Sequence, residues 1–283
     1  MAGRDENNGD SLINDVTLHG LPGTLLFTLR ARAAETSRSD ALLHDELAAA
    51  WYRRIVVPPA MQAMMEAAYT PVFQLGTAVR ARLYDDMTAN FLAARTQALV
   101  VELGAGLSTR YQRFARPGLQ WVELDLAEAI AYRRQLEGET AVHHFLPTSM
   151  TDPHWPSALP AMPAADTLFL AEGVLFFLSP EEVAALFGLL ARHFGGAGIG
   201  MDVLTQRFSR QARAAFAAAD VPMRWLVADV QDVADLGVTI HQQWTVTHLH
   251  LSRWQALGFD PQKLLASAGN IVLSGTVDGD GNP

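Results

Sequence analysis

Short apolar segments that alternate with helical patterns dominate the chain from Ala98 onward. The segments are five or six residues long and lie at 98–103, 120–124, 142–146, 167–171 and 199–204. Segments of this kind are typical of strands buried on both faces of a parallel sheet. Helical patterns lie between several of them, at 109–114, 126–136 and 180–194. Ser179 is suited to the N-cap of the last helix and Pro180 to its first turn. The alternation predicts an α/β fold with helices on both faces of the sheet.

The chain on either side of this region has other patterns. From residue 24 to about 92, apolar residues recur at three- and four-residue steps. This spacing predicts helices at 41–57, 61–69 and 79–92, the first of them preceded by Ser39 and Asp40. Residues 206–236 also have a helical pattern, whereas 238–247 and 271–277 are predicted strands. We therefore expect a helical front section joined to the α/β region.

The charged residues and the absence of cysteine narrow the class of partner. The formal net charge is −9 and the only lysine is Lys263, so no cluster of cations is available to follow a nucleic acid. Without cysteine, disulfides and thiolate sites are excluded, and no cluster of histidines and carboxylates predicts a metal site. The chain shows neither a signal peptide nor an apolar stretch of about 18 residues. We expect a cytoplasmic protein that acts on a small molecule, without nucleic acid, membrane or metal.

The segment from Glu102 to Gly106 lies where the first predicted strand gives way to a helix. Gly104 and Gly106 allow close approach of a ligand, as in nucleotide sites, although a tight turn would also explain them. Thr109 stands where the dinucleotide motif has its third glycine. The Glu102 carboxylate would repel a pyrophosphate, by about 4 kcal/mol at about 4 Å and an effective dielectric near 20. It would attract the sulfonium and ammonium groups of S-adenosylmethionine. The loop favours this cofactor over NAD, unless Glu102 is merely a solvated strand end.

Acidic residues also end two later strands. Asp125 lies about twenty residues beyond the loop, where this class of fold places an acid that binds ribose hydroxyls. Glu123 could take that role, and Asp125 could instead cap the helix that begins at Leu126. Glu172 ends the strand at 167–171, in the row where open α/β sheets bind ligands.

Two aromatic residues follow Glu172 closely. Phe176 and Phe177 could line a substrate cavity, although such pairs are more often part of a core.

Several segments together resemble the leucine carboxyl methyltransferase family, and within it the tetracenomycin-type branch of polyketide O-methyltransferases. The resemblance extends from about Leu18 to Phe259. It is carried by GLPGTLLFTLRARAAE, DALLHDELA, VRARLYDDM, VVELGAGLSTRYQRF, WVELDLAEAIAYRR, TSMTDPHW and AEGVLFFLSPEEV. It implies a class I S-adenosylmethionine-dependent methyltransferase fold, which is Rossmann-like, with a helical N-terminal lid. Residues 1–95 would form the lid and 96–283 the cofactor-binding domain, with a lid insertion near 205–236.

The resemblance also assigns site residues. Arg80 matches the arginine that pairs with the carboxylate of the cofactor, although from spacing alone Arg80 and Arg82 look like the solvated face of a helix. Gly104 matches the cofactor loop, Asp125 the ribose acid, and Glu172 the glutamate beside the methionine moiety.

Two positions depart from the leucine carboxyl branch. The adenine-contacting acid of that branch falls at Ser149, followed by Met150, and the tyrosine of its glutamate motif falls at Phe177. Both departures point away from a protein C-terminus and toward a small acidic or phenolic natural product.

The acceptor group decides which further residues the reaction needs. A carboxylate is ionised at pH 7 and needs orientation only, for which Arg30 and Arg32 are candidates. A phenol needs a general base, most simply a histidine. His241, His248 and His250 have the spacing of a half-exposed strand, so the catalytic residue is left open.

Two other functions are compatible with the same fold. One is an NAD(P)-dependent oxidoreductase, which the Glu102 and Thr109 arguments disfavour. The other is a methyltransferase-like protein that binds the cofactor without catalysis.

Overall fold

The computed structural model describes residues 24–279, apart from 58–61, 63–64, 67–68, 219 and 267. Most of the helix predicted at 61–69, and residues 1–23 of the predicted lid, therefore lie outside the described residues.

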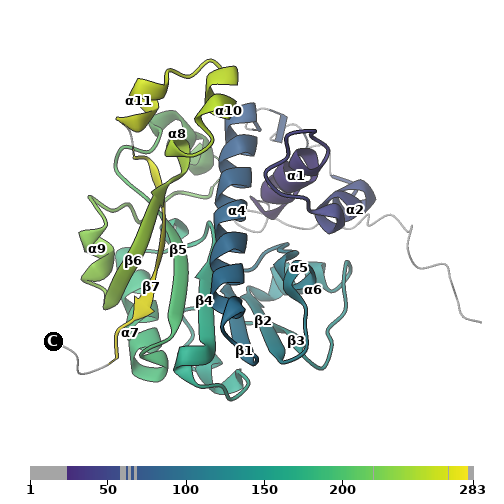
Figure 1. Ribbon diagram of the computed structural model, residues 1–283, viewed down its shortest axis with the longest axis vertical. Coiled ribbons are helices and arrows are strands. Elements are labelled where there is room, and N and C mark those ends of the chain that lie inside the picture. The colour runs from purple at the N-terminus through teal and green to yellow at the C-terminus, as the bar shows by residue number, and fades with distance from the viewer. Residues whose placement is uncertain are drawn as a thin grey trace, which may run out of the picture.

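A seven-stranded sheet in the order β3-β2-β1-β4-β5-β7-β6 forms the centre of the molecule (Figure 1). Its parallel strands are β1 (Ala98–Leu103), β2 (Leu119–Asp125), β3 (His143–Pro147), β4 (Thr167–Ala171) and β5 (Gly198–Leu204). The antiparallel strands are β7 (Asn270–Val277), which pairs with β5, and β6 (Val238–Thr245) at the edge. The predicted Rossmann-like α/β fold is confirmed, and the two late strands prove to be antiparallel.

The residues of β1 face two helical layers in alternation. Leu99 and Val101 belong to the core beneath α7 (Pro180–Phe194), whereas Ala98 and Val100 belong to the core beneath α4 (Pro71–Ala93). This alternation follows from the two-residue period of a strand. In Figure 1 α4 runs along the sheet beside β4 and β1. Although α4 lies within the range expected for the lid, it is part of the layer that covers the sheet.

Helix α7 begins and ends as its sequence predicts. The Ser179 hydroxyl accepts from the backbone N–H of Glu182, and the Glu182 side chain accepts from the N–H of Ser179. Pro180 occupies the first helical position. This reciprocal capping box satisfies two N–H groups that a helix start leaves unpaired.

The N-terminal helices differ from their predicted boundaries. Helix α1 spans Leu25–Thr36, and α2 spans Glu46–Arg54 in place of the predicted helix at 41–57. Asp45, not Ser39 or Asp40, caps α2, because its side chain accepts from the N–H of Ala48.

Both helices lie above α5 (Arg110–Phe114) and α6 (Ala127–Arg133) in Figure 1. They share a hydrophobic core with Leu107 and with Tyr132 of α6.

The helix predicted across 206–236 is wrong for its central part. The structure has α8 (Arg210–Ala218) and the short α9 (Gln231–Ala234). Asp220 adopts a left-handed conformation with φ of 60°, and Pro222 follows. A left-handed residue cannot continue a right-handed helix, and proline inside a helix interrupts it. Beyond them Val227 donates to the carbonyl of Leu204 at the end of β5.

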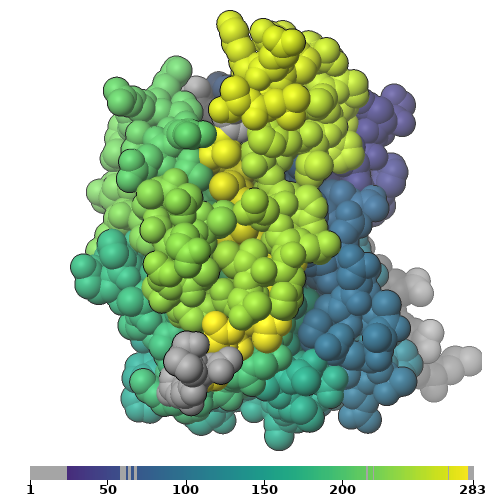
Figure 2. Space-filling model, turned by 60° about the vertical axis from the view of Figure 1, so that its left-hand side comes forward, coloured from purple at the N-terminus to yellow at the C-terminus, as the bar shows by residue number. Residues whose placement is uncertain are grey.

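The remaining elements are short. They are η2 (Trp155–Ala158), η3 (Ala164–Asp166), η4 (Leu175–Phe177), η5 (Val246–His248), α10 (Leu251–Ala256) and α11 (Pro261–Leu265). Helices α10 and α11, coloured yellow-green to yellow, stand at the top of the molecule in Figures 1 and 2. Among the described residues, no helix combines the length and apolar character needed to cross a membrane.

Candidate active site

The loop between β1 and α5 has a backbone that requires glycine. Gly104 and Gly106 have φ of 69° and 55°, values that L side chains rarely adopt. A Cβ on Gly104 would lie 2.6 Å from Val174 Cγ2, and one on Gly106 would lie 2.6 Å from Leu25 Cδ2. The loop therefore packs closely against the turn after β4 and against α1, and a Cβ at either glycine would clash with these neighbours.

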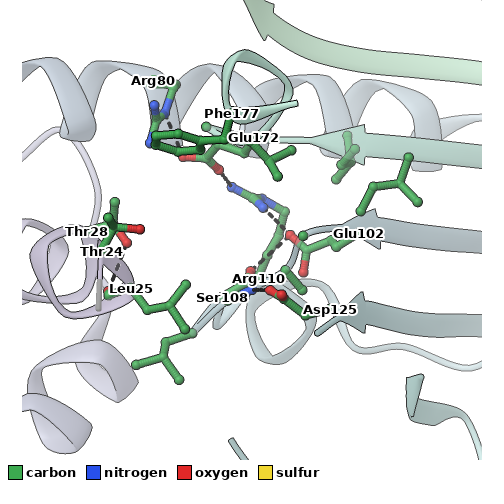
Figure 3. A pocket seen from close by; sticks show the side chains of 18 of the residues that line it. Thr24, Leu25, Thr28, Arg80, Glu102, Ser108, Arg110, Asp125, Glu172 and Phe177 are labelled. Atoms are coloured by element: carbon green, nitrogen blue, oxygen red, sulfur yellow. Dashed lines mark hydrogen bonds and ion pairs between the residues drawn. The ribbon is translucent and has the colours of Figure 1, made fainter. Parts of the chain in front are cut away.

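A pocket opens between this loop, the ends of β2 and β4, and helices α1 and α4 (Figure 3). Its empty volume is about 800 Å³, a figure that includes space open to solvent. Of the residues proposed from sequence, it is lined by Arg32, Arg80, Glu102, Gly104, Gly106, Asp125, Glu172 and Phe177.

Arginines and carboxylates alternate along one wall of the pocket. Arg80 Nε donates to Glu172 Oε1 at 3.1 Å, and Arg110 Nη2 donates to Glu172 Oε2 at 2.6 Å. Arg110 Nη1 also donates to Glu102 Oε1. Figure 3 shows the Arg110 guanidinium between the two glutamates. The wall thus joins α4, the end of β4, the start of α5 and the end of β1.

Asp202 of β5 supports the Arg80 end of this wall from beneath. It is fully buried, and Arg80 Nη1 donates to its Oδ2 at 3.4 Å. The N–H of Gly173 donates to Oδ1 at 2.6 Å, and the Tyr84 hydroxyl lies 3.1 Å from the same atom. Asn270 Nδ2 donates to Oδ2 at 3.2 Å. One carboxylate therefore positions both Arg80 and the turn after Glu172.

The ionisation of Glu172 follows from these contacts. Burial alone would raise the pKa of Glu172, but the guanidinium groups of Arg110 and Arg80 outweigh burial and lower the pKa to about 2. The group is therefore an anion at any physiological pH.

Asp125 lies at the end of β2, and both of its oxygens accept from the backbone. Oδ2 accepts from the N–H of Gly106 and Oδ1 from that of Leu126, each at 2.7 Å. Burial raises the pKa of Asp125, and these two donors oppose the rise. Leu126 is itself the N-cap of α6 and has no side-chain cap, so Asp125 braces the glycine loop and does not cap the helix.

Glu123, the alternative to Asp125, points elsewhere. Its side chain is fully buried and pairs with Arg133 at 2.6 Å and with His143 at 2.9 Å, outside the pocket. Burial raises its pKa. The sequence-based suggestion that Glu123 could replace Asp125 at the ligand is therefore wrong.

Glu102 is buried, with 3% of its surface exposed, so the alternative of a solvated strand end is wrong. Its Oε1 accepts from Ser108 at 2.9 Å as well as from Arg110, and its Oε2 accepts from Trp121 Nε1 at 3.2 Å. The negative charge of Glu102 is thus matched by a guanidinium, which the sequence argument did not foresee.

Helix α1 is fastened to the glycine loop through Arg32. Its Nε donates to Asp45 Oδ2 at 2.9 Å and its Nη2 to the carbonyl of Leu107 at 2.5 Å. Thr109, at the position of the missing third glycine, donates to the same Asp45 oxygen at 2.5 Å. Burial opposes ionisation of Asp45, but Arg32 and Arg113 outweigh it and lower its pKa.

Some residues proposed from sequence do not line the pocket. The Arg30 guanidinium lies 4.1 Å from the centre of the Tyr69 ring, and Phe176 is buried against Phe177. Ser149 and Met150 are also outside the lining. Met150 packs on the loop, since its Cε would lie 3.1 Å from a Cβ on Gly104.

The three histidines considered as bases lie away from the pocket, and no histidine of the described residues lines it. His241 is exposed and contacts Thr276, and His248 contacts the carbonyl of Leu264. His250 adopts a left-handed conformation before α10. Within the described part of the chain, no group of three or more histidine and carboxylate side chains is placed to hold a metal.

Sequence reasoning missed Arg110 and Asp202. Arg110 is the first residue of α5, a position where the helix dipole disfavours a cation. A cation at such a position indicates that carboxylates lie nearby and compensate for the dipole. Asp202 is an acid within the apolar strand β5, which is unusual unless the acid is paired.

Comparison with known proteins agrees with this geometry. Residues 26–191 match the family model of leucine carboxyl methyltransferase. The chain is 25% identical over 242 residues to the tetracenomycin polyketide synthesis O-methyltransferase TcmP of Streptomyces glaucescens, covering 82% of this chain and 85% of that protein. It is 31% identical over 215 residues to a protein of Streptomyces coelicolor named as an S-adenosyl-L-methionine-dependent methyltransferase, covering 72% and 75%.

A solved structure supports the fold alone. The geranyl diphosphate C-methyltransferase of Streptomyces coelicolor superimposes with a TM-score of 0.51 at 12% identity, covering 86% of this chain and 84% of that one. Its structure contains S-adenosyl-L-homocysteine. The family match and the relatives named as S-adenosyl-L-methionine-dependent methyltransferases confirm the predicted cofactor, and the alternative of an NAD(P)-dependent oxidoreductase is wrong. The protein belongs to the leucine carboxyl methyltransferase family and is an S-adenosyl-L-methionine-dependent methyltransferase.

Proposed function

We propose that the protein transfers the methyl group to an oxygen of a small polyketide-like molecule, and that this oxygen belongs to a carboxylate. One observation carries the choice of acceptor. Among the described residues, the pocket has no histidine, lysine or tyrosine in its lining, and its arginines are paired with carboxylates. A carboxylate, with a pKa near 4, needs no base at pH 7, whereas a phenol does.

The pocket suits S-adenosylmethionine in shape and charge. Gly104 and Gly106 leave a cradle that a Cβ would fill, and the Asp125 carboxylate lies at its rim as a ribose ligand. Glu172 and Glu102 provide fixed negative charge for the cationic groups of the cofactor.

Arg80 is proposed to hold the carboxylate of the cofactor. Its Nη2 lies against Gly173, 2.8 Å from where a Cβ would stand, and makes no hydrogen bond within the described residues. Ser149 and Met150 would support the adenine side from outside the lining.

The protein residues mainly align the acceptor and exclude water. When bound, the cofactor supplies a methyl group on a sulfonium, which an ionised oxygen displaces in line. Arg32 and Phe177 line the pocket and are our candidates for contact with the acceptor, whereas Arg30 and Phe176 would act through their neighbours.

We also propose that the N-terminal section and the 205–236 insertion cover the acceptor. Phe216 of α8 supports this, since its ring lies 6.1 Å from that of Phe177 at the pocket wall.

A matched pair of acceptors tests the proposal. 2-Naphthoate and 2-naphthol differ in the acceptor group alone, and each is incubated with methyl-labelled cofactor between pH 6 and 8. We expect the label to be transferred to 2-naphthoate, at a rate of transfer that changes little with pH. The labelled product should be an ester, which treatment with base hydrolyses. Transfer to 2-naphthol but not to 2-naphthoate would overturn the carboxylate assignment. Binding of S-adenosylhomocysteine with no transfer to either acceptor would favour the non-catalytic alternative.

A further inference from the structure

Arg110 has an unusual number of anionic partners for a buried cation. Its side chain is 3% exposed, and its guanidinium donates to carboxylates of three elements. Nε donates to Asp85 of α4 at 2.9 Å, Nη1 to Glu102 of β1, and Nη2 to Glu172 after β4 at 2.6 Å. Each of the three guanidinium nitrogens therefore donates to a different carboxylate.

The two pocket carboxylates depend on Arg110 to different degrees. Glu172 has a second cation in Arg80, whereas the other donors to Glu102 are the neutral Ser108 and Trp121. Strands β1 and β4 are neighbours in the sheet, and Glu102 is in register with Leu170, two residues before Glu172. Glu102 is buried and the Glu172 side chain is 17% exposed. Without a cation between them, two carboxylates at adjacent strand ends would repel each other, and one member of such a pair retains a proton more readily.

We propose that Arg110 is a positioning residue of the cofactor site, because its guanidinium bridges Glu102 and Glu172 and holds both side chains at the part of the pocket that would receive the cationic groups of the cofactor. The inference rests on the proposed contact of Glu172 with the methionine moiety and is independent of the acceptor.

Charged and titratable groups reach Glu172 from several elements. They are Arg110 of α5, Arg80 and Tyr84 of α4, Arg32 of α1, Glu102 of β1 and, through Arg80, Asp202 of β5. In the variant Arg110→Met the largest favourable charge is lost while the burial remains, so the pKa of Glu172 should rise.

Calorimetric titration with S-adenosylhomocysteine between pH 5 and 7 tests this. In the wild type the dissociation constant should change by less than about twofold over this range, since Glu172 stays ionised. In Arg110→Met we expect binding about tenfold weaker at pH 5 than at pH 7, because protonated Glu172 no longer attracts the ammonium group. Titration in buffers of different ionisation heat should detect protons released on binding in Arg110→Met and none in the wild type.

A second ligand isolates the group responsible. 5′-Methylthioadenosine retains the ribose but lacks the ammonium and carboxylate. Any titration of Asp125 would therefore affect both ligands, and a change confined to S-adenosylhomocysteine reports on the glutamates. Adding Glu102→Gln to Arg110→Met should reduce the pH dependence, since the repulsion between the two carboxylates is gone although the attraction of Arg110 is not restored.

Arg113→Met is the matched control. Arg113 lies on the same helix and shares Asp85 with Arg110, but contacts neither glutamate. For Arg113→Met, the ratio of the affinities for S-adenosylhomocysteine at pH 5 and pH 7 should equal that of the wild type. If Arg110→Met binds more weakly with a wild-type pH profile, Arg110 merely supports the loop and the proposal is wrong.

Two further variants keep the outcome decisive. Arg110→Lys retains a charge that cannot bridge both carboxylates, so it should show the same pH trend to a smaller degree if the methionine variant does not fold. Glu172→Gln in the wild type must itself weaken binding of S-adenosylhomocysteine. If it does not, the proposed role of Glu172 is wrong, which is a different failure from that of Arg110.

Discussion

Arg80 and Arg82 lie two positions apart on α4, and their side chains have opposite environments. Arg80 is 13% exposed and pairs with Glu172 and Asp202, whereas Arg82 is 52% exposed and pairs with Asp86 one turn away. The suggestion of a solvated face was right for Arg82 and wrong for Arg80. Residues two apart on a helix point in different directions, so the two arginines could not share one solvated face. Spacing alone did not reveal which of them faces the pocket.

The variant Arg80→Met tests the assignment of this residue. We expect the affinity for S-adenosylhomocysteine to fall by about 2–5 kcal/mol, because a desolvated charged contact is lost. The affinity for 5′-methylthioadenosine, which lacks the carboxylate, should change far less. Arg82→Met should alter either affinity by less than about 0.5 kcal/mol. Equal weakening of both ligands by Arg80→Met would instead assign Arg80 to support of the pocket.

Asp125 should contribute to the affinity for the cofactor by accepting hydrogen bonds from the ribose hydroxyls. We expect Asp125→Ala to weaken S-adenosylhomocysteine and 5′-methylthioadenosine alike, by about 1.5–3 kcal/mol, since both ligands carry the hydroxyls. The variant also removes the acceptor of two N–H groups: that of Leu126, which is exposed, can donate to water, whereas that of Gly106 is buried and should lower the stability if it is left unpaired. Calorimetry measures the affinities and a thermal melt the stability. An early melt with normal affinity would contradict the ribose role.

At the scale of single elements, α7 is the helix whose sequence and structure agree best. Its start depends on the local capping box of Ser179 and Glu182, and its apolar face packs on the sheet. The helix contributes no residue to the lining of the pocket. Substitutions at the ends of α7 should therefore change the stability of the protein and leave ligand binding unchanged.

Ser179→Ala provides that test. Loss of one capping acceptor should cost about 1 kcal/mol, which lowers the melting temperature by about 2–4 °C in a protein of this size. Ser157→Ala, an exposed serine that caps no helix, should shift stability by less than about 0.5 kcal/mol. A change in the affinity for S-adenosylhomocysteine in Ser179→Ala would show that α7 is coupled to the site.

For the whole molecule, the stability at low pH should depend on the ion pairs of the pocket, because they connect four elements. Glu172 has a pKa of about 2 in the folded protein, because Arg110 and Arg80 outweigh its burial, against about 4.5 when unfolded. A lowered folded pKa stabilises the protein fully above the unfolded pKa, and the contribution is lost as the pH falls through the folded pKa. The affected window is therefore from about pH 4.5 down to about pH 2.

Urea unfolding across this window measures the effect. Glu172 should account for up to about 3 kcal/mol of the stability lost on acidification. Glu172→Gln should be less stable at pH 7 but show a smaller loss between pH 4.5 and 2. Glu128→Gln, which removes an exposed acid on α6, should retain the wild-type slope. A slope in Glu172→Gln as steep as that of the wild type would mean that other acids dominate.

Some features of this protein were determined by the sequence alone, because they depend on neighbours along the chain. The five parallel strands follow from periodicity, the glycine loop from glycine at positive φ, and the start of α7 from a capping box between residues three positions apart. Helices α2 and α8 were predicted too long, because a helical pattern does not reveal that Asp45 caps later or that Asp220 takes a left-handed conformation.

The tertiary structure alone decided the partners of the charged residues. Arg80 and Glu172 are separated by 92 positions, and Arg110 and Glu172 by 62. No local pattern indicates that β1 and β4 are adjacent, or that their acidic ends meet the same guanidinium. Charges interact through space in a medium of low polarity, so each ionisation state depends on which elements the fold brings together.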